Sequence, residues 1–318
     1  MSLRLVMMGT GRFAIPSFER MLQSSHQVVG LLTQPDRTGR GHHHHVNPMK
    51  ELAVAHGVPV WQPDNVNLPE SREALRTLDA DVCVVAAYGQ ILSAELLAIP
   101  RLGFYNIHAS ILPKYRGAAP IQFAIFHGET ETGVSIFRIE PKLDAGPVLG
   151  ISTLKIDPKE TAGDLEVRLA ALAPELLMRI LDDLEHDRGT PIPQDPAAVT
   201  KAPRLKKTDG LIDWSETNRQ IDRRVFAMQP WPKPVTYLHQ PGHRGIRLLL
   251  LDVEPVDIQT SAQPGEVISV EQGTILVAAT NGAVELRTVQ PDGKRPMSAA
   301  DFLNGHSIRV GDRFDSTP

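Results

Sequence analysis

The sequence is poor in cysteine and in aromatic residues. It has one cysteine, Cys83, and aromatic residues make up 5% of its 318 positions. A lone thiol cannot form an internal disulfide, which excludes the disulfide-stapled domains typical of secreted proteins. No apolar run is long enough to cross a bilayer, and no charged segment followed by an apolar one at Met1 marks a secretory signal. We therefore expect a cytoplasmic protein with no membrane partner.

A strong charge of one sign is also missing. The net charge is −4, with 18 Lys and Arg against 23 Asp and Glu in residues 1–200, and 15 against 14 from residue 201 onward. This contrast permits a basic surface on the C-terminal part but does not by itself indicate a nucleic-acid partner. Hydrophobic residues at 42% over this length suffice for two buried cores, so we expect two globular domains.

Apolar runs alternate with helical stretches in the first half of the chain, which predicts an α/β fold with a parallel-type sheet. The first run, 3–8, leads through Gly9-Thr10-Gly11 into a predicted helix at 13–22. This turn is an incomplete dinucleotide motif, because Ala14 stands at the position of its last glycine and no acidic residue follows the next strand in the expected way. A dinucleotide site is therefore disfavoured.

The stretch 103–122 carries the densest set of reactive groups. It begins as a strand in which Asn106 and His108 are two residues apart, so both side chains lie on one face. Pro113 ends the strand, and a turn leads to a predicted helix at 118–126. Ligands of open α/β sheets bind beyond the carboxyl ends of the strands, so this strand–loop–helix segment is the first candidate for an active site.

This segment resembles a known family. Three strings are similar to those of the folate-dependent formyltransferases: Asn106-x-His108-x-Ser110-Ile-Leu-Pro113, Arg116-Gly-Ala-Ala-Pro-Ile-Gln122 and Leu143-Asp-Ala-Gly146. The resemblance implies a Rossmann-like domain, catalytic residues Asn106, His108 and Asp144, and 10-formyltetrahydrofolate as co-substrate, with no metal. It also implies that reduced folate contacts residues of two segments: Tyr88, Gly89, Gln90, Ile91, Leu92, Ser110, Ile111, Leu112 and Pro113.

The loop that carries Asp144 lies between predicted strands at 132–139 and 148–156. Members of the family generally have glycine at the position of Lys142. If that position requires a positive φ, we expect strain at Lys142 or a reshaped loop.

A long glycine-rich loop at 34–48 follows the second predicted strand, and loops of this length in compact domains are usually functional. The resemblance implies that Arg40 in this loop reaches the acceptor end of a tRNA. Four histidines at 42–45 admit three interpretations: a metal site, a stray tag, or a polar loop surface that is basic only below about pH 6.5. Adjacent residues cannot all face one ion, and a tag would stand at a terminus, so the polar surface is favoured.

A long helix is predicted where Thr161 can cap the chain and Asp164 follows three residues later. Its apolar side chains recur at helical spacing, which indicates a core-facing stripe rather than a partner site: Leu165, Leu169, Leu172, Leu176, Ile180 and Leu184. Pro174 should kink this helix or divide it in two.

Periodicity disappears at 187–203, where glycine, proline, threonine, aspartate and alanine dominate, and this composition indicates a stiff linker. Short strands with glycine turns follow, a pattern typical of a small antiparallel barrel. We therefore predict an α/β catalytic domain at 1–186, a linker at 187–208 and an OB-like β-barrel domain at 209–318.

The C-terminal part extends the resemblance. Four stretches are similar to the second domain of family members that act on methionyl initiator tRNA: 201–207, Ile212-Asp-Trp214, Pro230-Trp-Pro232 and 290–305. The likeness runs from Leu3 to Phe314 and implies transfer of a formyl group to the α-amino group of methionyl initiator tRNA. It also implies a tRNA surface made by the barrel with Arg40, Lys206 and Lys207. No obligate protein partner is expected.

Two other functions stay open. An aminosugar or small-amine formyltransferase would share residues 1–185 and differ in its second domain, and the string Gly293-Lys-Arg-Pro-Met-Ser298 argues against it. A catalytically silent folate- or nucleotide-binding protein would need the α/β layout alone. The joint presence of Asn106, His108 and Asp144 argues against that function.

Overall fold

The computed structural model describes residues 2–36, 47–242 and 244–317. Its contacts divide the chain into two compact units. The N-terminal unit comprises Met1–Pro120, Glu131–Lys155 and Glu166–Pro203, and the C-terminal unit comprises Ile121–Thr130, Ile156–Leu165 and Arg204–Pro318. Among the helices of the described residues, none is long and apolar enough to span a bilayer.

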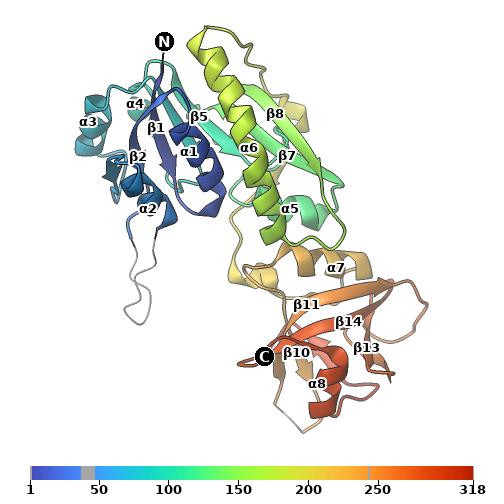
Figure 1. Ribbon diagram of the computed structural model, residues 1–318. Helices are drawn as coiled ribbons and strands as arrows, with labels where there is room; N and C mark the ends of the chain where they lie inside the picture. Colours follow the sequence, from blue (N-terminus) through green and yellow to red (C-terminus); the bar gives the residue numbers. More distant parts are fainter. Residues whose placement is uncertain (1, 37–46, 243, 318) are drawn as a thin grey trace. The chain divides into compact units, whose positions relative to one another are not determined.

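The N-terminal unit is built on a seven-stranded sheet with the order β3-β2-β1-β4-β5-β7-β8 (Figure 1). The first five strands in this order are parallel, and β7 and β8 are antiparallel to their neighbours. The strands are β1 (Arg4–Gly9), β2 (Gln27–Leu32), β3 (Val60–Trp61), β4 (Val82–Ala86), β5 (Gly103–His108), β7 (Glu131–Arg138) and β8 (Val148–Lys155). The predicted α/β fold with a parallel-type sheet is confirmed.

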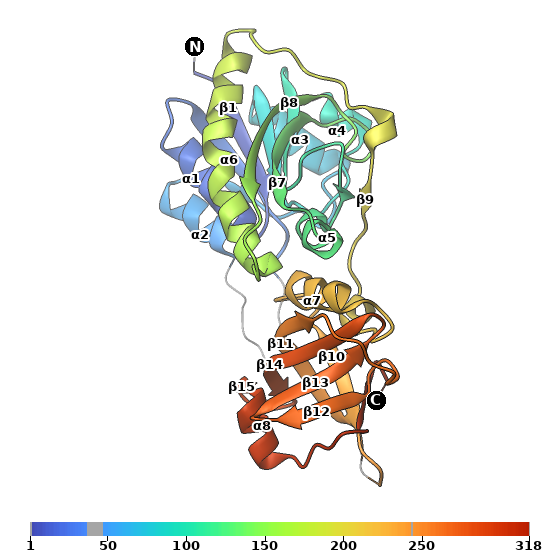
Figure 2. The same ribbon diagram turned by 90° about the vertical axis from the view of Figure 1, so that its right-hand side faces the viewer.

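Helices cover both faces of this sheet, which explains why β4 is buried along its whole length. Figure 2 shows α1 (Ile15–Leu22) and α2 (Pro48–Ala55) on one face and α3 (Pro69–Thr77) and α4 (Ala94–Leu97) on the other. The chain moves outward from β1 to β3 and then returns to place β4 on the other side of β1. The carboxyl ends of β1, β4 and β5 therefore flank the topological switch point, where open α/β sheets bind ligands.

The predicted long helix is α6 (Ala162–Glu185). Its cap is reciprocal, because the Asp164 N–H donates to Thr161 Oγ1 at 3.2 Å and the Thr161 N–H donates to Asp164 Oδ2 at 3.3 Å. The helix is continuous through Pro174, so the proline does not divide it. Four members of the apolar stripe are buried, which confirms its role in the core: Leu165, Leu169, Leu176 and Ile180.

The C-terminal unit holds an antiparallel sheet with the order β12-β13-β14-β11-β10-β16, and β15 pairs with β14. The strands are β10 (Val235–His239), β11 (Ile246–Val256), β12 (Val267–Glu271), β13 (Thr274–Ala279), β14 (Gly282–Pro291), β15 (Met297–Ser298) and β16 (Arg313–Asp315). The sheet curls until its edges meet, since the Phe314 N–H donates to the Gly265 carbonyl at 2.7 Å. Gly265 is needed at this closure because an added Cβ would lie 2.2 Å from the Phe314 oxygen. This curled sheet agrees with the predicted OB-like barrel.

Helices α7 (Asn218–Ala227) and α8 (Ala299–Gly305) belong to the same unit. Helix α5 (Pro120–His127), which comes much earlier in the sequence, also packs there from its second residue onward. The Arg224 guanidinium lies over the Phe126 ring at 4.7 Å from its centroid, which is within the range of a cation–π interaction. The C-terminal unit is therefore assembled from three separate stretches of the chain.

Candidate active site

Strand β5 carries the first two predicted catalytic residues. It is paired on both sides, with Val85 of β4 and Phe137 of β7 opposite Asn106. This pairing fixes the backbone, and the alternation of an extended chain directs the Asn106 and His108 side chains to one face. The His108 ring is 5% exposed and meets the Phe137 ring edge-on, with the centroids 6.3 Å apart.

The imidazole of His108 lies between a backbone carbonyl and a carboxylate. Its Nε2 is 2.9 Å from the Tyr115 carbonyl oxygen, which can only accept a hydrogen bond, so Nε2 carries a proton and donates it. Its Nδ1 is 3.9 Å from Asp144 Oδ2, beyond hydrogen-bond distance but close enough for a charge interaction when both ring nitrogens carry a proton. The two side chains are 6% and 11% exposed, and buried pairs are only weakly screened by salt. The structure therefore brings His108 and Asp144 together.

Asp144 lies in the loop between β7 and β8, which we call the aspartate loop (residues 140–146). Its φ of 46° is unfavourable for a non-glycine residue by about 1–2 kcal/mol. Its Oδ2 accepts a hydrogen bond from the Gly117 N–H at 2.8 Å. Gly146 ends the loop, where an added Cβ would lie 1.8 Å from the Arg138 carbonyl oxygen. The strain expected at Lys142 is not found, because the positive φ among the described non-glycine residues of this loop belongs to Asp144.

The carboxamide of Asn106 is half-buried, and among the residues that the structure describes it has no hydrogen-bond partner. A polar group in this situation gains free energy when a partner satisfies it. Asn106 is therefore available to donate an N–H to a bound substrate.

The first predicted folate segment connects β4 to α4. Gly89 has a φ of 85°, a conformation that favours glycine and lets the backbone approach a ligand closely. Tyr88 is buried, which raises the pKa of its hydroxyl to about 12, and this hydroxyl has no partner within the described residues. The Gln90 amide is used internally, accepting a backbone N–H at 2.8 Å. Leu92 is buried, whereas Ile91 is 81% exposed.

The second predicted folate segment follows β5. Ser110 and Leu112 are buried, and Ile111 and Pro113 are half-buried. The Ser110 Oγ donates to the Lys114 carbonyl at 2.6 Å, so this hydroxyl stabilises the turn. A ligand at this segment would meet backbone groups and the half-buried side chains.

Sequence reasoning missed two residues of the site, Gln194 and Thr200, which lie in the stretch predicted as a linker. Thr200 Oγ1 accepts the Tyr115 N–H at 2.8 Å. The residues that directly follow Tyr115 and Thr200 also pair, because β6 (Arg116–Gly117) and β9 (Lys201–Ala202) form a parallel two-stranded sheet. Gln194 donates to two carbonyl oxygens of the aspartate loop. A proline-rich stretch without periodicity carries no signal for such contacts.

The predicted tRNA residues fall into two groups. Arg40 lies outside the described residues, as do the four histidines at 42–45. Lys206 and Lys207 belong to the C-terminal unit, and both are exposed. Neither ammonium group forms an ion pair with any residue that the structure describes. Both charges are therefore available to a polyanion.

One group of potential metal ligands occurs in the described part of the chain, at the exposed end of α6: Asp182, Glu185 and His186. Asp182 already pairs with Arg188 there. Exposed acidic groups at a helix end commonly form such ion pairs, and none of these residues belongs to the predicted active site.

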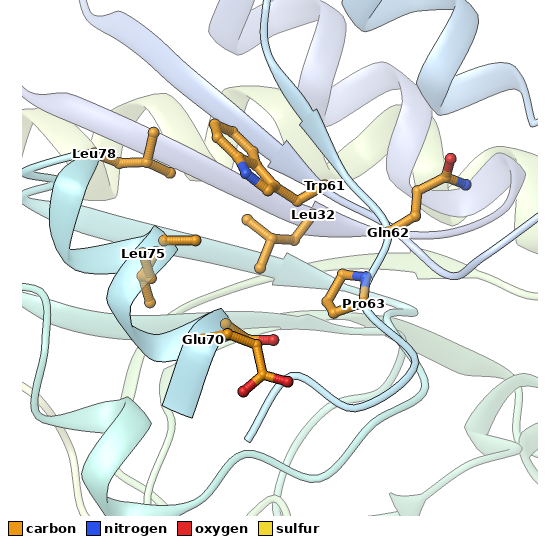
Figure 3. Close-up of a pocket in the computed structure, with 9 residues that line it drawn as sticks. Leu32, Trp61, Gln62, Pro63, Glu70, Leu75 and Leu78 are labelled. Atoms are coloured by element: carbon orange, nitrogen blue, oxygen red, sulfur yellow. The ribbon is translucent and has the colours of Figure 1, made fainter. Parts of the chain in front are cut away.

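A pocket of about 270 Å³ lies beside β3 and α3 in the N-terminal unit. Figure 3 shows apolar side chains of Leu32, Trp61, Leu75 and Leu78 around it. The rest of its lining is Gln62, Pro63, Glu70, Ser71 and Ala74. None of the described catalytic or folate-segment residues lines this pocket, so it is separate from the predicted active site.

Comparison with known proteins identifies one family. The model of the formyl transferase family matches residues 3–181, and the model of the formyl transferase C-terminal domain matches residues 204–307. A methionyl-tRNA formyltransferase from Methylococcus capsulatus is 43% identical over 96% of this chain and 98% of its own length. A protein of the same name from Solibacter usitatus is 41% identical over 98% of each chain.

Two solved structures share the fold at low identity. HypX from Aquifex aeolicus, in complex with tetrahydrofolic acid, has a TM-score of 0.60 and 17% identity over 95% of this chain and 47% of that one. An N-formyltransferase from Helicobacter canadensis, in complex with folinic acid and dTDP-3-aminofucose, has a TM-score of 0.65 and 15% identity over 92% of this chain and 100% of that one. At such identities the likeness establishes the fold alone.

Proposed function

The chain belongs to the formyl transferase family, and from this premise we propose that it transfers the formyl group of 10-formyltetrahydrofolate to the α-amino group of methionyl initiator tRNA. The extent of the sequence likeness carries this proposal. Relatives named methionyl-tRNA formyltransferase match nearly the whole chain at 41–43% identity, including the C-terminal unit. By contrast, the N-formyltransferase solved with dTDP-3-aminofucose matches 92% of this chain at only 15% identity.

Reduced folate is proposed to bind beyond the carboxyl ends of β4 and β5. The described residues fit a flat ligand with polar edges. Gly89 leaves the backbone open at its positive φ, and the Tyr88 hydroxyl and Asn106 carboxamide lack partners among the described residues. Ile111 and Pro113 add half-buried apolar surface. These features support the assignment of residues 88–92 and 110–113 to folate.

The oxygen of the formyl group gains negative charge when the amine adds to the formyl carbon. In the proposed mechanism, the Asn106 carboxamide donates a hydrogen bond to this oxygen. His108 donates a second one from Nδ1, because its Nε2–H is already bonded to the Tyr115 carbonyl. Loss of one such donor typically costs about a hundredfold or more in rate. The unpaired carboxamide of Asn106 supports its part in this step. When the tetrahedral intermediate collapses, the bond between the formyl carbon and the folate nitrogen breaks, and this nitrogen takes up a proton so that tetrahydrofolate leaves as an amine.

Asp144 is proposed to orient His108 and to accept, directly or through water, the proton that the α-ammonium group must shed to become a nucleophilic amine. Its carboxylate is anchored by the Gly117 N–H and lies 3.9 Å from His108 Nδ1. The second oxygen, Oδ1, is proposed to take this proton. An anchored carboxylate suits this role because general-base catalysis depends on geometry before it depends on pKa.

The tRNA surface is proposed to comprise the barrel of the C-terminal unit with Arg40, Lys206 and Lys207. Both lysines are exposed and form no ion pair among the described residues, which supports this assignment.

We further propose a catalytic domain at 1–186, a linker at 187–208 and a tRNA-binding domain at 209–318. The protein is proposed to act in the cytoplasm without an obligate protein partner.

The test of this function is a comparison of amine acceptors. Formyl transfer from 10-formyltetrahydrofolate should be fast with methionyl initiator tRNA, much slower with methionyl elongator tRNA, and absent with free methionine or a dTDP-aminosugar. Radiolabelled formyl incorporation into acid-precipitable tRNA measures the first two acceptors. Preference for the dTDP-aminosugar would replace the proposed function with the aminosugar alternative.

A further inference from the structure

Gln194, like Thr200, is a side chain of the stretch 187–203 that contacts the active-site loops. Most of its neighbours from 191 to 200 are exposed, whereas Gln194 itself is half-buried. Its Nε2 donates to the Asp144 carbonyl at 2.9 Å and to the Gly146 carbonyl at 2.7 Å. Both amide protons are therefore used on the aspartate loop.

The orientation of this amide is set from the other side. Gln194 Oε1 accepts two hydrogen bonds from Arg116, from Nε at 3.0 Å and from Nη2 at 2.7 Å. A guanidinium can only donate, so Oε1 must face Arg116 and Nε2 must face the aspartate loop. Arg116 also begins β6, and its neighbour Gly117 holds the Asp144 carboxylate. Gln194 thus ties together the two loops that carry the site.

The aspartate loop needs such a tie because of its backbone. Asp144 has a positive φ, and a residue in this conformation persists only where surrounding contacts hold it. Gln194 binds the carbonyls of Asp144 and of Gly146, two residues later. The segment itself is secured near Gln194, since Ile192 and Val148 exchange two backbone hydrogen bonds of 2.8 Å each. A secured donor can therefore fix the loop.

We propose that Gln194 is a positioning residue for formyl transfer. Its hydrogen bonds connect the aspartate loop to Arg116 and thereby keep the Asp144 side chain beside His108. This inference rests on the proposed function for its catalytic consequence. The clamp itself is a property of the loop, and it can be measured without turnover.

Two substitutions separate the parts of the clamp. Gln194→Leu removes all four hydrogen bonds with little change in volume. Gln194→Glu keeps an acceptor for Arg116 but cannot donate to the two carbonyls. Both variants should lower kcat by about 10- to 100-fold, the loss that follows when a catalytic group is displaced by about 1 Å. KM for folate and for tRNA should stay within about twofold, because Gln194 acts on Asp144 and not on substrate binding.

The matched control is Gln229→Leu. Gln229 Nε2 also donates to two backbone carbonyls, those of Val225 and Leu251, at 2.9 and 3.0 Å, but in the C-terminal unit. Its loss should lower the melting temperature to a degree similar to Gln194→Leu and leave kcat unchanged. A general destabilisation would affect both variants alike.

Two further readouts decide the inference. In an Asp144→Ala background, Gln194→Leu should cause no further loss of kcat, because residues that act as a unit are not additive. Backbone amide exchange in residues 140–146 should be at least about tenfold faster in Gln194→Leu than in the wild type or Gln229→Leu.

Three outcomes would overturn the inference: wild-type kcat in both Gln194 variants, a full additional loss of kcat in the Asp144→Ala background, or unchanged amide exchange. A wild-type protein that transfers no formyl group to methionyl-tRNA would refute the proposed function, and the exchange rates would still decide whether Gln194 holds the loop.

Discussion

The proposed functional residues of the two units differ in how they are held. In the N-terminal unit, His108 and Asp144 are almost buried, and backbone groups hold each of them. In the C-terminal unit, Lys206 and Lys207 are exposed and, within the described chain, outside any ion pair. Acyl transfer needs groups held within fractions of an ångström, whereas phosphate binding needs positive charge within reach. The difference supports a division of labour in which the first unit does the chemistry and the second binds tRNA.

Removing a proposed catalytic side chain should have the largest effect. We expect Asn106→Ala and Asp144→Ala each to lower kcat for formyl transfer by at least about a hundredfold, because each side chain acts on the transition state. Melting temperatures should barely change, since neither side chain is part of a hydrophobic core cluster. Steady-state kinetics with Asp182→Ala, an exposed carboxylate at the end of α6, supply the control. Near-normal kcat in either site variant would remove that residue from the mechanism.

Removing a cation of the proposed tRNA surface should have a smaller effect, on tRNA affinity rather than on kcat. Replacing Arg40, Lys206 or Lys207 with Ala should weaken tRNA binding by about tenfold per lost charged contact and leave folate affinity unchanged. Each loss should also reduce the slope of log affinity against log salt by somewhat under one unit. Fluorescence titrations of tRNA over a salt series measure both quantities. Superimposable lines for wild type and Arg40→Ala would leave the 34–48 loop without an assigned role.

N-terminal fragments of the chain test whether the first domain folds and binds folate without the second. A fragment cut near Pro191 should fold alone and bind reduced folate, because α6 completes its core. It should bind folate a few-fold more weakly than a fragment that ends at Pro203, since the shorter one lacks β9 and Thr200, which hold Tyr115 and Arg116. Tryptophan fluorescence titration compares the two. If both were insoluble or blind to folate, the two-domain division would be wrong.

The smallest expected effect lies at the amino end of β4, away from the chemistry. Burial alone would raise the pKa of Asp81, but hydrogen bonds from the Arg4 N–H and the Arg101 guanidinium lower it below its usual value. A carboxyl with a lowered pKa contributes stability above its unfolded pKa, and that contribution is lost as pH falls through the folded pKa. Asp81→Asn should therefore cost up to about 1 kcal/mol at pH 7 and less at about pH 3, below the usual aspartate pKa of about 3.9.

Urea unfolding at the two pH values tests this prediction, and kcat should be unchanged at pH 7. An equal loss of stability at both pH values would mean that Asp81 acts through packing rather than charge. A loss of kcat would mean that both ends of the sheet contribute to catalysis.

Regular patterns in the sequence predicted regular structure well. The strand pair expected at 132–139 and 148–156 is β7 and β8, and the capped helix after Thr161 is α6. In both cases the signal is local: alternation in the strands, and a cap followed by helical spacing in the helix.

Contacts between distant segments could not be predicted in the same way. Gln194 stands between prolines in a stretch without periodicity, and its role depends on Arg116, 78 residues away. The closure of the barrel at Gly265 likewise depends on a carbonyl that only the folded chain brings near. The condition for strain at Lys142, a positive φ at that position, is not met, because the positive φ belongs to Asp144 instead.

The central claim is that chemistry and tRNA binding are carried by different residues. Single-turnover formyl transfer, measured as a function of tRNA concentration, separates the two, since the plateau reports the chemical step and the midpoint reports tRNA affinity. We expect His108→Ala to lower the plateau by at least about a hundredfold with an unchanged midpoint. The Lys206→Ala, Lys207→Ala double variant should shift the midpoint and keep the plateau. A near-normal plateau for His108→Ala, or a lowered plateau for the lysine variant, would contradict the account.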